Sequence, residues 1–468
     1  MTLAVWALAP VGVDTTGASA QTANGLKFLM SLITPRTLKG FRDYLPQAML
    51  PREELIATAR RVYRSYGFAP IDTPALEYLE ILTGKGSDET DKQLYRFTDH
   101  GGRDVGLRFD LTVPLARVAA QYSQELGLPF KRYHIASVWR GENTQRGRYR
   151  EFMQCDFDTI GSESVGSDIE TALVIYDLLR AIGIERFTIR VNHRGVLNGL
   201  LERLGLADQS TAILRAIDKL AKIGPEQVAS EMAQTAGATK EQAADVLRFA
   251  SLTGTRDQIF AELEGLVAGS EKGEAGIDRA RQVLAGVAAA GVPDTQVVLD
   301  PSIARGLDYY TGMIYETLLD DLPAIGSVAS GGRYDNLAET FTKQRLPGIG
   351  ASLGLDRLLA AMEELNLLPE SRTPAEVFVP LFDESLLPHL LPFCARLRAA
   401  GLRVELFGEA KKLGKQLQYA SRRGHRVAII IGPDEWADQQ CQVKNLADGS
   451  TSTVKVEGAV EAVCDLFR

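Results

Sequence analysis

The chain contains 468 residues, of which 45% are hydrophobic and 24% are charged, and its formal net charge is −8. This balance is typical of a globular protein with two or three apolar cores, and it excludes a disordered chain or one embedded in a membrane. The negative charge also excludes indiscriminate binding to nucleic acids, DNA included, so any contact with RNA has to come from local basic patches.

The first 30 residues differ in composition from the rest of the chain. Residues 3–13 are apolar, but the run is short, contains Pro10 and lacks the basic start of a secretory signal. It is also too short to span a bilayer. Residues 14–24 are small and polar. We therefore interpret residues 1–30 as a disordered or mis-assigned N-terminal extension without a targeting function.

A body of alternating helix and strand signals is expected over residues 31–194. Leu50–Tyr66 has apolar residues at helical spacing and ends at Gly67, after which a strand is expected from Phe68. Further strand-like runs stand at residues 106–111, 133–140, 154–159, 188–192, 314–319 and 327–330.

The segment Tyr133–Phe152 is the most informative part of the chain. It carries Arg140, Arg146, Arg148 and Arg150, and it contains no lysine. The alternation on both sides of a turn-like centre predicts a β-hairpin, with Arg148 and Arg150 on one face. Planar guanidinium groups on a rigid ribbon suit bidentate binding of phosphate oxygens. The simpler alternative is a solvated, arginine-rich edge hairpin, but the apolar frame with its acids and amides favours a nucleotide site.

Residues 195–298 change to a sequence rich in alanine, leucine, glutamate and lysine, which predicts a helical insertion. Residues 299–366 resume the pattern of residues 31–194 and contain the segments ARGLDYYTG (304–312) and GIGASLGLDRLL (348–359). A polar, proline-flanked boundary follows at 369–374.

Residues 374–468 alternate strand and helix, which predicts a small α/β domain with a partly parallel sheet. Within this domain, residues 411–426 hold six cations and no acid. A basic run of this kind is by itself more often a solvated helix face than a binding site.

Three motifs together resemble those of a known family. Arg140 followed by GRYREF, with Gln154 and Asp158, is similar to the second signature motif of class II aminoacyl-tRNA synthetases in the form found in histidyl-tRNA synthetases. ARGLDYYTG resembles the motif peculiar to the histidine enzymes, and GIGASLGLDRLL resembles the third motif of the class. The resemblance implies an α+β catalytic domain with a mainly antiparallel sheet, a helical insertion and a C-terminal anticodon-binding α/β domain.

The resemblance also implies the reaction, which is activation of L-histidine by ATP to histidyl-adenylate and transfer to the 3′ end of tRNA(His). Arg140 matches the position that holds the α-phosphate, Arg148 and Arg357 match those for the terminal phosphates, and Glu142 matches the one for the adenine amino group. Magnesium is expected to bridge the phosphates. The arginine of ARGLDYYTG, Arg305, matches the catalytic cation beside the α-phosphate and the substrate carboxylate.

Histidine selection requires polar partners for both imidazole nitrogens. By resemblance, Asp158 and Tyr310 are these partners, and Tyr334 lies in the same pocket. The family has a glutamate where this chain has Asp158, which shortens the reach by one methylene. The positions that match the site for the α-amino group are Asp110, Thr112 and Gln154.

Contacts with tRNA are expected from Arg146 near the acceptor end and from the basic run, namely Lys411, Lys412, Lys415, Arg422 and Arg423. In a domain that resembles an anticodon-binding unit, we interpret this run as an RNA contact whose affinity falls with salt. The resemblance further implies a homodimer.

Two alternatives stay open at this point. One is a catalytically inactive paralogue that acts as the regulatory subunit of ATP phosphoribosyltransferase, and the other is a non-catalytic tRNA-binding module. The four cysteines, Cys155, Cys394, Cys441 and Cys464, form no C-x-x-C pair and have no histidine at zinc spacing. They indicate a reducing compartment, the cytoplasm, and no metal site.

Overall fold

A computed structural model of the chain describes residues 33–83, 88–303, 309–368 and 373–467. The expectations for residues 1–30 and for Arg305 therefore lie outside the described residues.

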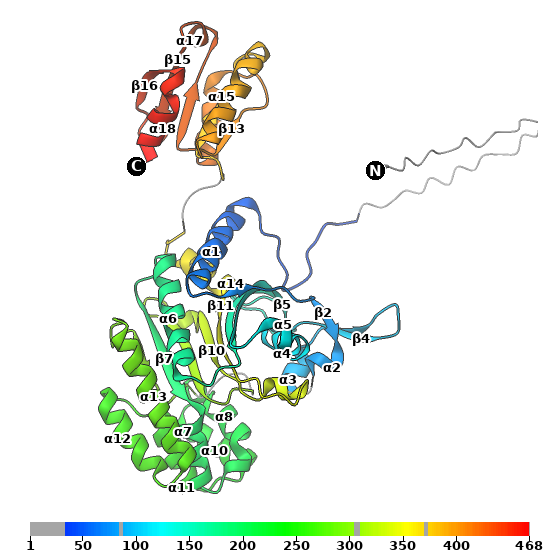
Figure 1. Ribbon diagram of the computed structural model, residues 1–468, viewed down its shortest axis with the longest axis vertical. Helices are drawn as coiled ribbons and strands as arrows, with labels where there is room; N and C mark the ends of the chain where they lie inside the picture. Colours follow the sequence, from blue (N-terminus) through cyan, green and yellow to red (C-terminus); the bar gives the residue numbers. More distant parts are fainter. Residues whose placement is uncertain (1–32, 84–87, 304–308, 369–372, 468) are drawn as a thin grey trace, which may run out of the picture. The chain divides into compact units, whose positions relative to one another are not determined.

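An eight-stranded sheet forms the centre of the first part of the chain (Figure 1). Its order is β1-β5-β6-β11-β10-β9-β7-β8, and all pairs are antiparallel except β1–β5 and β7–β8. The prediction of a mainly antiparallel sheet is confirmed. The strands are β1 (Ala69–Pro70), β5 (Phe130–Trp139), β6 (Glu151–Ile160), β7 (Phe187–His193), β8 (Val297–Leu299), β9 (Met313–Leu319), β10 (Ala329–Arg333) and β11 (Gly348–Gly354).

Helix α1 (Pro46–Ser65), helix α6 (Val165–Ile182) and helix α14 (Leu355–Glu364) pack on this sheet through apolar faces. In α1, Leu55, Ala59 and Val62 recur at helical spacing, and all three are buried. Helix α6 begins at the N-cap Ser164 and ends at Gly183, whose left-handed backbone favours glycine. This sheet and its helices provide the rigid frame on which the polar residues below are placed.

A smaller antiparallel sheet of order β2-β4-β3 lies between β1 and β5 in the sequence. Its strands and the neighbouring helices are β2 (Leu76–Tyr78), α2 (Leu79–Leu82), α3 (Asp88–Gln93), β3 (Arg96–Thr98), β4 (Asp104–Leu107), α4 (Thr112–Gln121) and α5 (Ser123–Leu126). None of the helices in the described ranges is long and apolar enough to cross a membrane.

The helices of the next segment gather on one side of the central sheet, at the bottom of Figure 1, and share one apolar core with it. These helices are α7 (Arg194–Arg203), α8 (Ser210–Ile217), α9 (Leu220–Ile223), α10 (Pro225–Ala236), α11 (Lys240–Ala250), α12 (Arg256–Val267) and α13 (Glu271–Ala289). Thr239 and Thr255 start two of them with capping boxes, in which side chain and backbone exchange hydrogen bonds. The chain returns to the central sheet at Val297, within the range in which the sequence predicts helix, because β8 pairs with β7.

The last part of the chain has a five-stranded sheet of order β13-β12-β14-β15-β16, in which the first three strands are parallel and the others antiparallel. The predicted partly parallel α/β fold is confirmed. Its elements are β12 (Val377–Val379), α15 (Leu387–Ala399), β13 (Val404–Leu406), α16 (Leu413–Arg423), β14 (Val427–Ile430), α17 (Pro433–Ala437), β15 (Gln440–Asn445), β16 (Thr451–Lys455) and α18 (Ala459–Phe467).

Candidate active site

The hairpin of β5 and β6 places a row of polar side chains on one face of the central sheet. Side chains of a strand alternate between its two faces, so Gln154, Asp156 and Asp158 of β6 share one face. In the hairpin register, Arg132 of β5 lies directly opposite Asp158. Each of the three charged residues is at most 3% exposed.

Arg132 holds the two acids together. Its Nη2 lies 2.8 Å from Asp158 Oδ2 and 4.0 Å from Asp156 Oδ2, and it donates to the carbonyl oxygen of Leu111 at 3.1 Å. Several buried atoms of this group have no hydrogen-bond partner among the described residues: Arg132 Nε and Nη1, Gln154 Oε1 and Asp156 Oδ1. Buried polar groups are normally satisfied, so these atoms indicate a binding site for a polar ligand.

Tyr334 completes this side of the site. It directly follows β10, and its hydroxyl donates to Asp158 Oδ1. The neighbouring strand β11 contributes glycines at the points of contact, because a Cβ atom at Gly348 would overlap the Tyr334 ring and one at Gly350 would overlap the Asp158 carboxylate. The sequence GIG therefore leaves the space that these two side chains occupy.

Asp110 and the tyrosine pair Tyr309–Tyr310 approach the same region from other segments. Asp110 Oδ1 accepts from the backbone N–H groups of Thr112 and Val113, at 3.1 and 2.9 Å, and so fixes the start of α4. Its other oxygen accepts from the Tyr309 hydroxyl at 3.4 Å. The Tyr309 ring makes edge contacts with the rings of Tyr310 and Tyr334.

The ionisation of this group follows from its burial. Burial raises the pKa of Tyr310 and Tyr334, so both hydroxyls stay protonated and able to donate. Burial also raises the pKa of Asp158, against the opposing effect of the Arg132 guanidinium. The pKa of Asp156 rises to about 7, because its burial and the nearby Asp158 charge outweigh the attraction of Arg132.

We expect Asp156→Asn to change how stability depends on pH. An unfolded aspartate titrates near pH 4, roughly, while folded Asp156 keeps its proton to about pH 7. Between these values the folded state binds more protons, so this group makes the wild-type protein less stable as pH rises. The asparagine variant should therefore gain stability relative to wild type between pH 4 and pH 7, by about 1 kcal/mol per pH unit. Urea unfolding at pH 5 and pH 8 measures this, and an equal difference at both values would contradict the assignment.

Arg140 directly follows β5, and its charge acts on the Asp110 carboxylate. Its guanidinium carbon lies 4.3 Å from the centroid of the Phe109 ring and 5.1 Å from that of Phe152, and Nε donates to the Phe109 carbonyl oxygen at 3.1 Å. The two rings and this hydrogen bond hold the fork in one orientation. Its terminal nitrogens have no protein acceptor among the described residues, which leaves them for an anion.

The hairpin is confirmed, but the prediction that Arg148 and Arg150 share a strand face is wrong. Strand β6 begins only at Glu151, and both arginines lie in the connection before it. The backbone of Arg150 instead bonds to the carbonyl oxygen of Gly40 at 2.8 Å, and its Nε donates to the Glu142 carbonyl oxygen. The Arg150 carbonyl oxygen still accepts from the Arg140 N–H at 2.9 Å, so the pairing with β5 ends at this residue, and Arg148 pairs across the turn with Gln145.

The connection between β5 and β6 brings Arg148 close to Glu142 and lies against Arg357. Arg148 Nη1 lies 3.9 Å from Glu142 Oε2, and both side chains are partly exposed. Gly147 has a positive φ of 68°, and a Cβ atom there would lie 3.0 Å from the Arg357 Cα atom, so the loop rests directly on the start of α14. Arg357 Nη1 donates to the Ser327 carbonyl oxygen. The predicted phosphate-binding arginines are thus neighbours.

Helix α14 is anchored by a buried ion pair behind this site. Asp356 pairs with Arg52 of α1, accepts from the Tyr44 hydroxyl, and accepts at 2.8 Å from the Met153 backbone of β6. Asp356 and Arg52 are each 4% exposed. This network ties the helix that carries Arg357 to the strand that carries Gln154.

The residues expected to contact tRNA lie on the surface. Arg146 forms an ion pair with Glu364 at 2.6 Å, and its side chain is 56% exposed. Lys411 and Lys412 precede helix α16, and they are exposed together with Lys415 and Arg422, whereas Arg423 is half-buried. On the opposite face, the buried Gln416 exchanges hydrogen bonds of 2.9 and 2.7 Å with the Leu381 backbone, which fixes the orientation of the basic face.

Sequence reasoning missed Arg132, Asp156 and Tyr309. Asp156 follows Gln154 by two residues, so the period of a strand already places it on the face of Gln154 and Asp158. Arg132 follows from the same hairpin once its register is known. Tyr309 has no signal that distinguishes it from Tyr310. The region also contains no group of three or more acids, histidines or cysteines that could hold a metal ion, within the described residues.

Comparisons with known proteins agree with this geometry. The family model of histidyl-tRNA synthetase matches residues 40–358, and that of the anticodon binding domain matches residues 376–466. The histidine–tRNA ligase of Rhodopirellula baltica is 61% identical over 423 residues, which cover 90% of this chain and 96% of that protein. The ligase of Wolinella succinogenes is 49% identical, with 92% and 98% covered. The crystal structure of histidyl-tRNA synthetase from Nostoc sp. PCC 7120 has a TM-score of 0.84 and 36% identity, and the alignment covers 93% of this chain and all of that chain. The chain belongs to the histidyl-tRNA synthetase family.

Proposed function

We propose that the protein activates L-histidine with ATP to form histidyl-adenylate and transfers the histidyl group to the 3′ end of tRNA(His), with release of pyrophosphate and AMP. The observation that carries this proposal is the buried polar group on the β5–β6 hairpin, whose unpartnered atoms lie on the two strands that flank the connection with Arg140 and Arg148. The family membership and the match of residues 376–466 to an anticodon binding domain support it.

Histidine recognition is assigned to the buried group. Asp158 accepts from one imidazole nitrogen and the Tyr310 hydroxyl pairs with the other, while Tyr334 and Arg132 hold Asp158 in place. The α-amino group is assigned to Gln154 Oε1 and to Asp110, which accept its hydrogen bonds. Gln154 Oε1 has no partner in the described chain, and Thr112 lies next to Asp110 at the same position. A site of this kind discriminates strongly, because a side chain without polar groups would leave these partners unsatisfied.

The arginines are assigned to ATP. Arg140 binds the α-phosphate, Arg148 and Arg357 bind the terminal phosphates, and Glu142 accepts from the adenine amino group. Arg305 lies outside the described residues, and its role beside the α-phosphate rests on the ARGLDYYTG motif. Charges that are already oriented stabilise the negative charge that develops on the phosphate without further reorganisation.

The two steps balance without a protein general base. A carboxylate oxygen of histidine bonds to the α-phosphorus, and the bond from that phosphorus to the bridging oxygen breaks, so pyrophosphate leaves with the electron pair. In the second step, a ribose hydroxyl of the terminal adenosine attacks the carbonyl carbon, its proton passes to a phosphate oxygen, and AMP leaves. The protein's task is to position the reactants and stabilise charge.

Magnesium is proposed to enter with ATP. This ion is usually held by substrate phosphates together with one or two carboxylates and water. The ion would neutralise part of the phosphate charge.

The regulatory-subunit alternative is less well supported. Such paralogues typically lack the anticodon-binding domain and have degraded motifs, whereas this chain keeps Arg140, Arg148, Arg305 and Arg357 together with residues 376–466. Exchange of pyrophosphate into ATP, measured with each amino acid and without tRNA, decides between the two. Exchange with histidine alone supports the proposed function, and no exchange by folded protein would leave the non-catalytic alternatives.

The exposed basic face of α16 is proposed to bind tRNA. In this test, alanine replaces Lys412, Lys415 and Arg422 together. The KM for tRNA in histidylation should rise, and the number of counter-ions released on tRNA binding, measured from the salt dependence of the affinity, should fall by up to about three. Pyrophosphate exchange without tRNA should not change. Lys455→Ala, an exposed cation on β16, is the matched control. Unchanged charging by the triple variant would show that the basic face is only solvated.

A homodimer and a cytoplasmic location complete the proposal. The β2-β4-β3 sheet exposes Leu76, Tyr78 and Phe97, by 40, 51 and 51% of their surface, and Tyr78 and Phe97 flank Val105 in register on one face. Such an apolar face suits a second copy of the chain. All four cysteines are free thiols, which agrees with a reducing compartment.

A further inference from the structure

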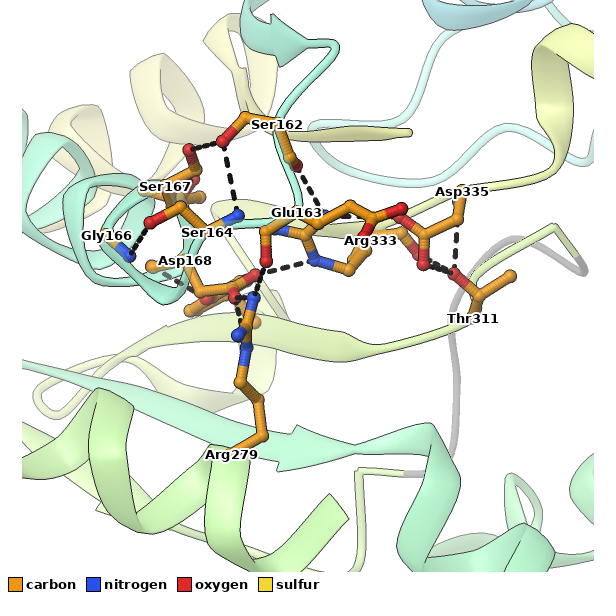
Figure 2. Close-up of polar contacts among 12 residues, drawn as sticks. Ser162, Glu163, Ser164, Gly166, Ser167, Asp168, Arg279, Thr311, Arg333 and Asp335 are labelled. Carbon is orange, nitrogen blue, oxygen red and sulfur yellow. Dashed lines mark hydrogen bonds and ion pairs between the residues drawn. The ribbon is translucent and has the colours of Figure 1, made fainter. Parts of the chain in front are cut away.

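Asp168 is a buried carboxylate that joins three parts of the fold, and none of the roles assigned above uses it. It lies in the first turn of α6 and its side chain is 0% exposed. Its Oδ1 accepts from Arg333 Nε at 2.9 Å, and its Oδ2 accepts from Arg279 Nε at 2.6 Å. Figure 2 shows the two guanidinium groups approaching Asp168, with Arg279 reaching it from helix α13.

Arg333 connects Asp168 to the proposed histidine pocket. Arg333 ends β10 and directly precedes Tyr334, whose hydroxyl bonds to Asp158. Arg333 Nη1 also donates to the Ser162 carbonyl oxygen at 2.9 Å and to Asp335 Oδ1 at 3.2 Å (Figure 2). The backbone on both sides of Tyr334 is therefore held by charged contacts that begin at Asp168.

Asp335 extends the contact to the segment that carries Tyr310. Thr311 Oγ1 donates to Asp335 Oδ2 at 2.8 Å and accepts from the Asp335 backbone at 3.1 Å, and the Thr311 N–H donates to the Arg333 carbonyl oxygen at 2.7 Å. A Cβ atom at Gly312 would lie 2.8 Å from Arg333 Cδ, so this residue packs directly on the arginine. Tyr310 and Tyr334 thus each adjoin a residue of one network.

The Arg279 side leads to the helical segment. Arg279 Nη2 also donates to the Glu163 carbonyl oxygen at 2.7 Å, just before α6. Helix α13 lies tightly against α6, since a Cβ atom at Gly286 would overlap the Ile169 side chain next to Asp168. A shift of α13 along α6 would therefore pull directly on the Asp168 carboxylate.

We propose that Asp168, Arg279, Arg333 and Asp335 form a positioning network that couples helix α13 of the helical insertion to the histidine pocket. Arg279 acts through Asp168 and Arg333 on the placement of Tyr334 and Tyr310, so the position of the insertion sets histidine affinity. The inference rests on the proposed function, because it assigns the pocket to histidine. An unbroken series of charged contacts supports this coupling: Arg279 bonds to Asp168, Asp168 to Arg333, and Arg333 to Asp335.

The test uses the full chain and compares two arginines of helix α13, Arg279 and Arg281. Arg279→Ala should raise the KM for histidine in pyrophosphate exchange about tenfold, a typical size for coupling between sites, with little change in the KM for ATP. Arg279→Lys keeps one charged contact and should give an intermediate value. Arg281→Ala is the matched control, because Arg281 lies on the same helix and pairs with Glu264 instead. Its KM for histidine should equal that of wild type.

Two further measurements separate positioning from general destabilisation. If the contacts act as one network, Arg279→Ala and Asp335→Ala together should raise the KM for histidine by less than the product of the single effects. Since coupling is reciprocal, added histidine should slow amide hydrogen exchange in α13 of wild type, and less so in Arg279→Ala.

The outcomes separate the network from the proposed function. Normal histidine-dependent exchange by wild type with an unchanged KM in Arg279→Ala would overturn the network and leave the proposed function intact. An equal rise in Arg281→Ala would also overturn it. If wild type itself shows no exchange with histidine, the proposed function fails, and this inference fails with it.

Discussion

Arg140→Ala is expected to lower the turnover number of histidine-dependent pyrophosphate exchange by about 10²–10³-fold, with a smaller change in the KM for histidine. The reason is that Arg140 is held between Phe109 and Phe152 with its terminal nitrogens left for the α-phosphate. Loss of one preorganised charge that acts on the transition state costs about 3–4 kcal/mol.

Two variants make the Arg140 experiment specific. Arg140→Lys keeps the charge but loses the planar fork, so it should recover only part of the activity. Arg180→Ala removes an arginine at the end of α6 that is 47% exposed, and it should exchange pyrophosphate as wild type does. A normal turnover number in Arg140→Ala would show that Arg140 takes no part in histidine activation.

Asp158→Ala is expected to raise the KM for histidine by about 100-fold or more while the KM for ATP changes little. A charge-assisted hydrogen bond to the imidazole contributes about 1.5–3 kcal/mol, and the Tyr334 hydroxyl would lose its acceptor as well. Pyrophosphate exchange at varied histidine and fixed, saturating ATP gives the two constants separately.

The Asp158 experiment needs a control for folding, because alanine leaves Asp156, at 4.0 Å, as the remaining acidic partner of the buried Arg132. An uncompensated buried charge costs about 3–5 kcal/mol of stability. Asp158→Asn has nearly the same shape and keeps one oxygen that can accept from Tyr334 or from Arg132, but it also removes the charge opposite Arg132. Urea unfolding therefore has to show that this variant is folded, and its KM for histidine should then rise. A folded asparagine variant with an unchanged KM for histidine would refute the imidazole assignment.

The sequence alone predicted the fold class, several of its strands and helices, and the order of the motifs along the chain. Alternation at residues 133–140 and 154–159 predicted the strands of the hairpin, because a strand's side-chain period is local and is read within a few residues. The helical spacing in Leu50–Tyr66 predicted α1 for the same reason. Gln154 and Asp158 were found from their motif, and the structure places them on one face of β6, where Asp158 bonds to Tyr334.

Contacts between distant segments were decided only by the tertiary structure. Strand β6 begins only after Arg148 and Arg150, because Arg148 pairs with Gln145 across a turn and the Arg150 N–H bonds to the Gly40 carbonyl oxygen. Arg132 lies in the pocket because the register of β5 and β6 places it opposite Asp158. Asp168 lies 111 residues from Arg279 and 165 from Arg333, and an acid in the first turn of a helix reads as ordinary helix stabilisation. Local periodicity carries no information about which charges meet across such separations, because packing of the sheet and of α13 on α6 brings them together.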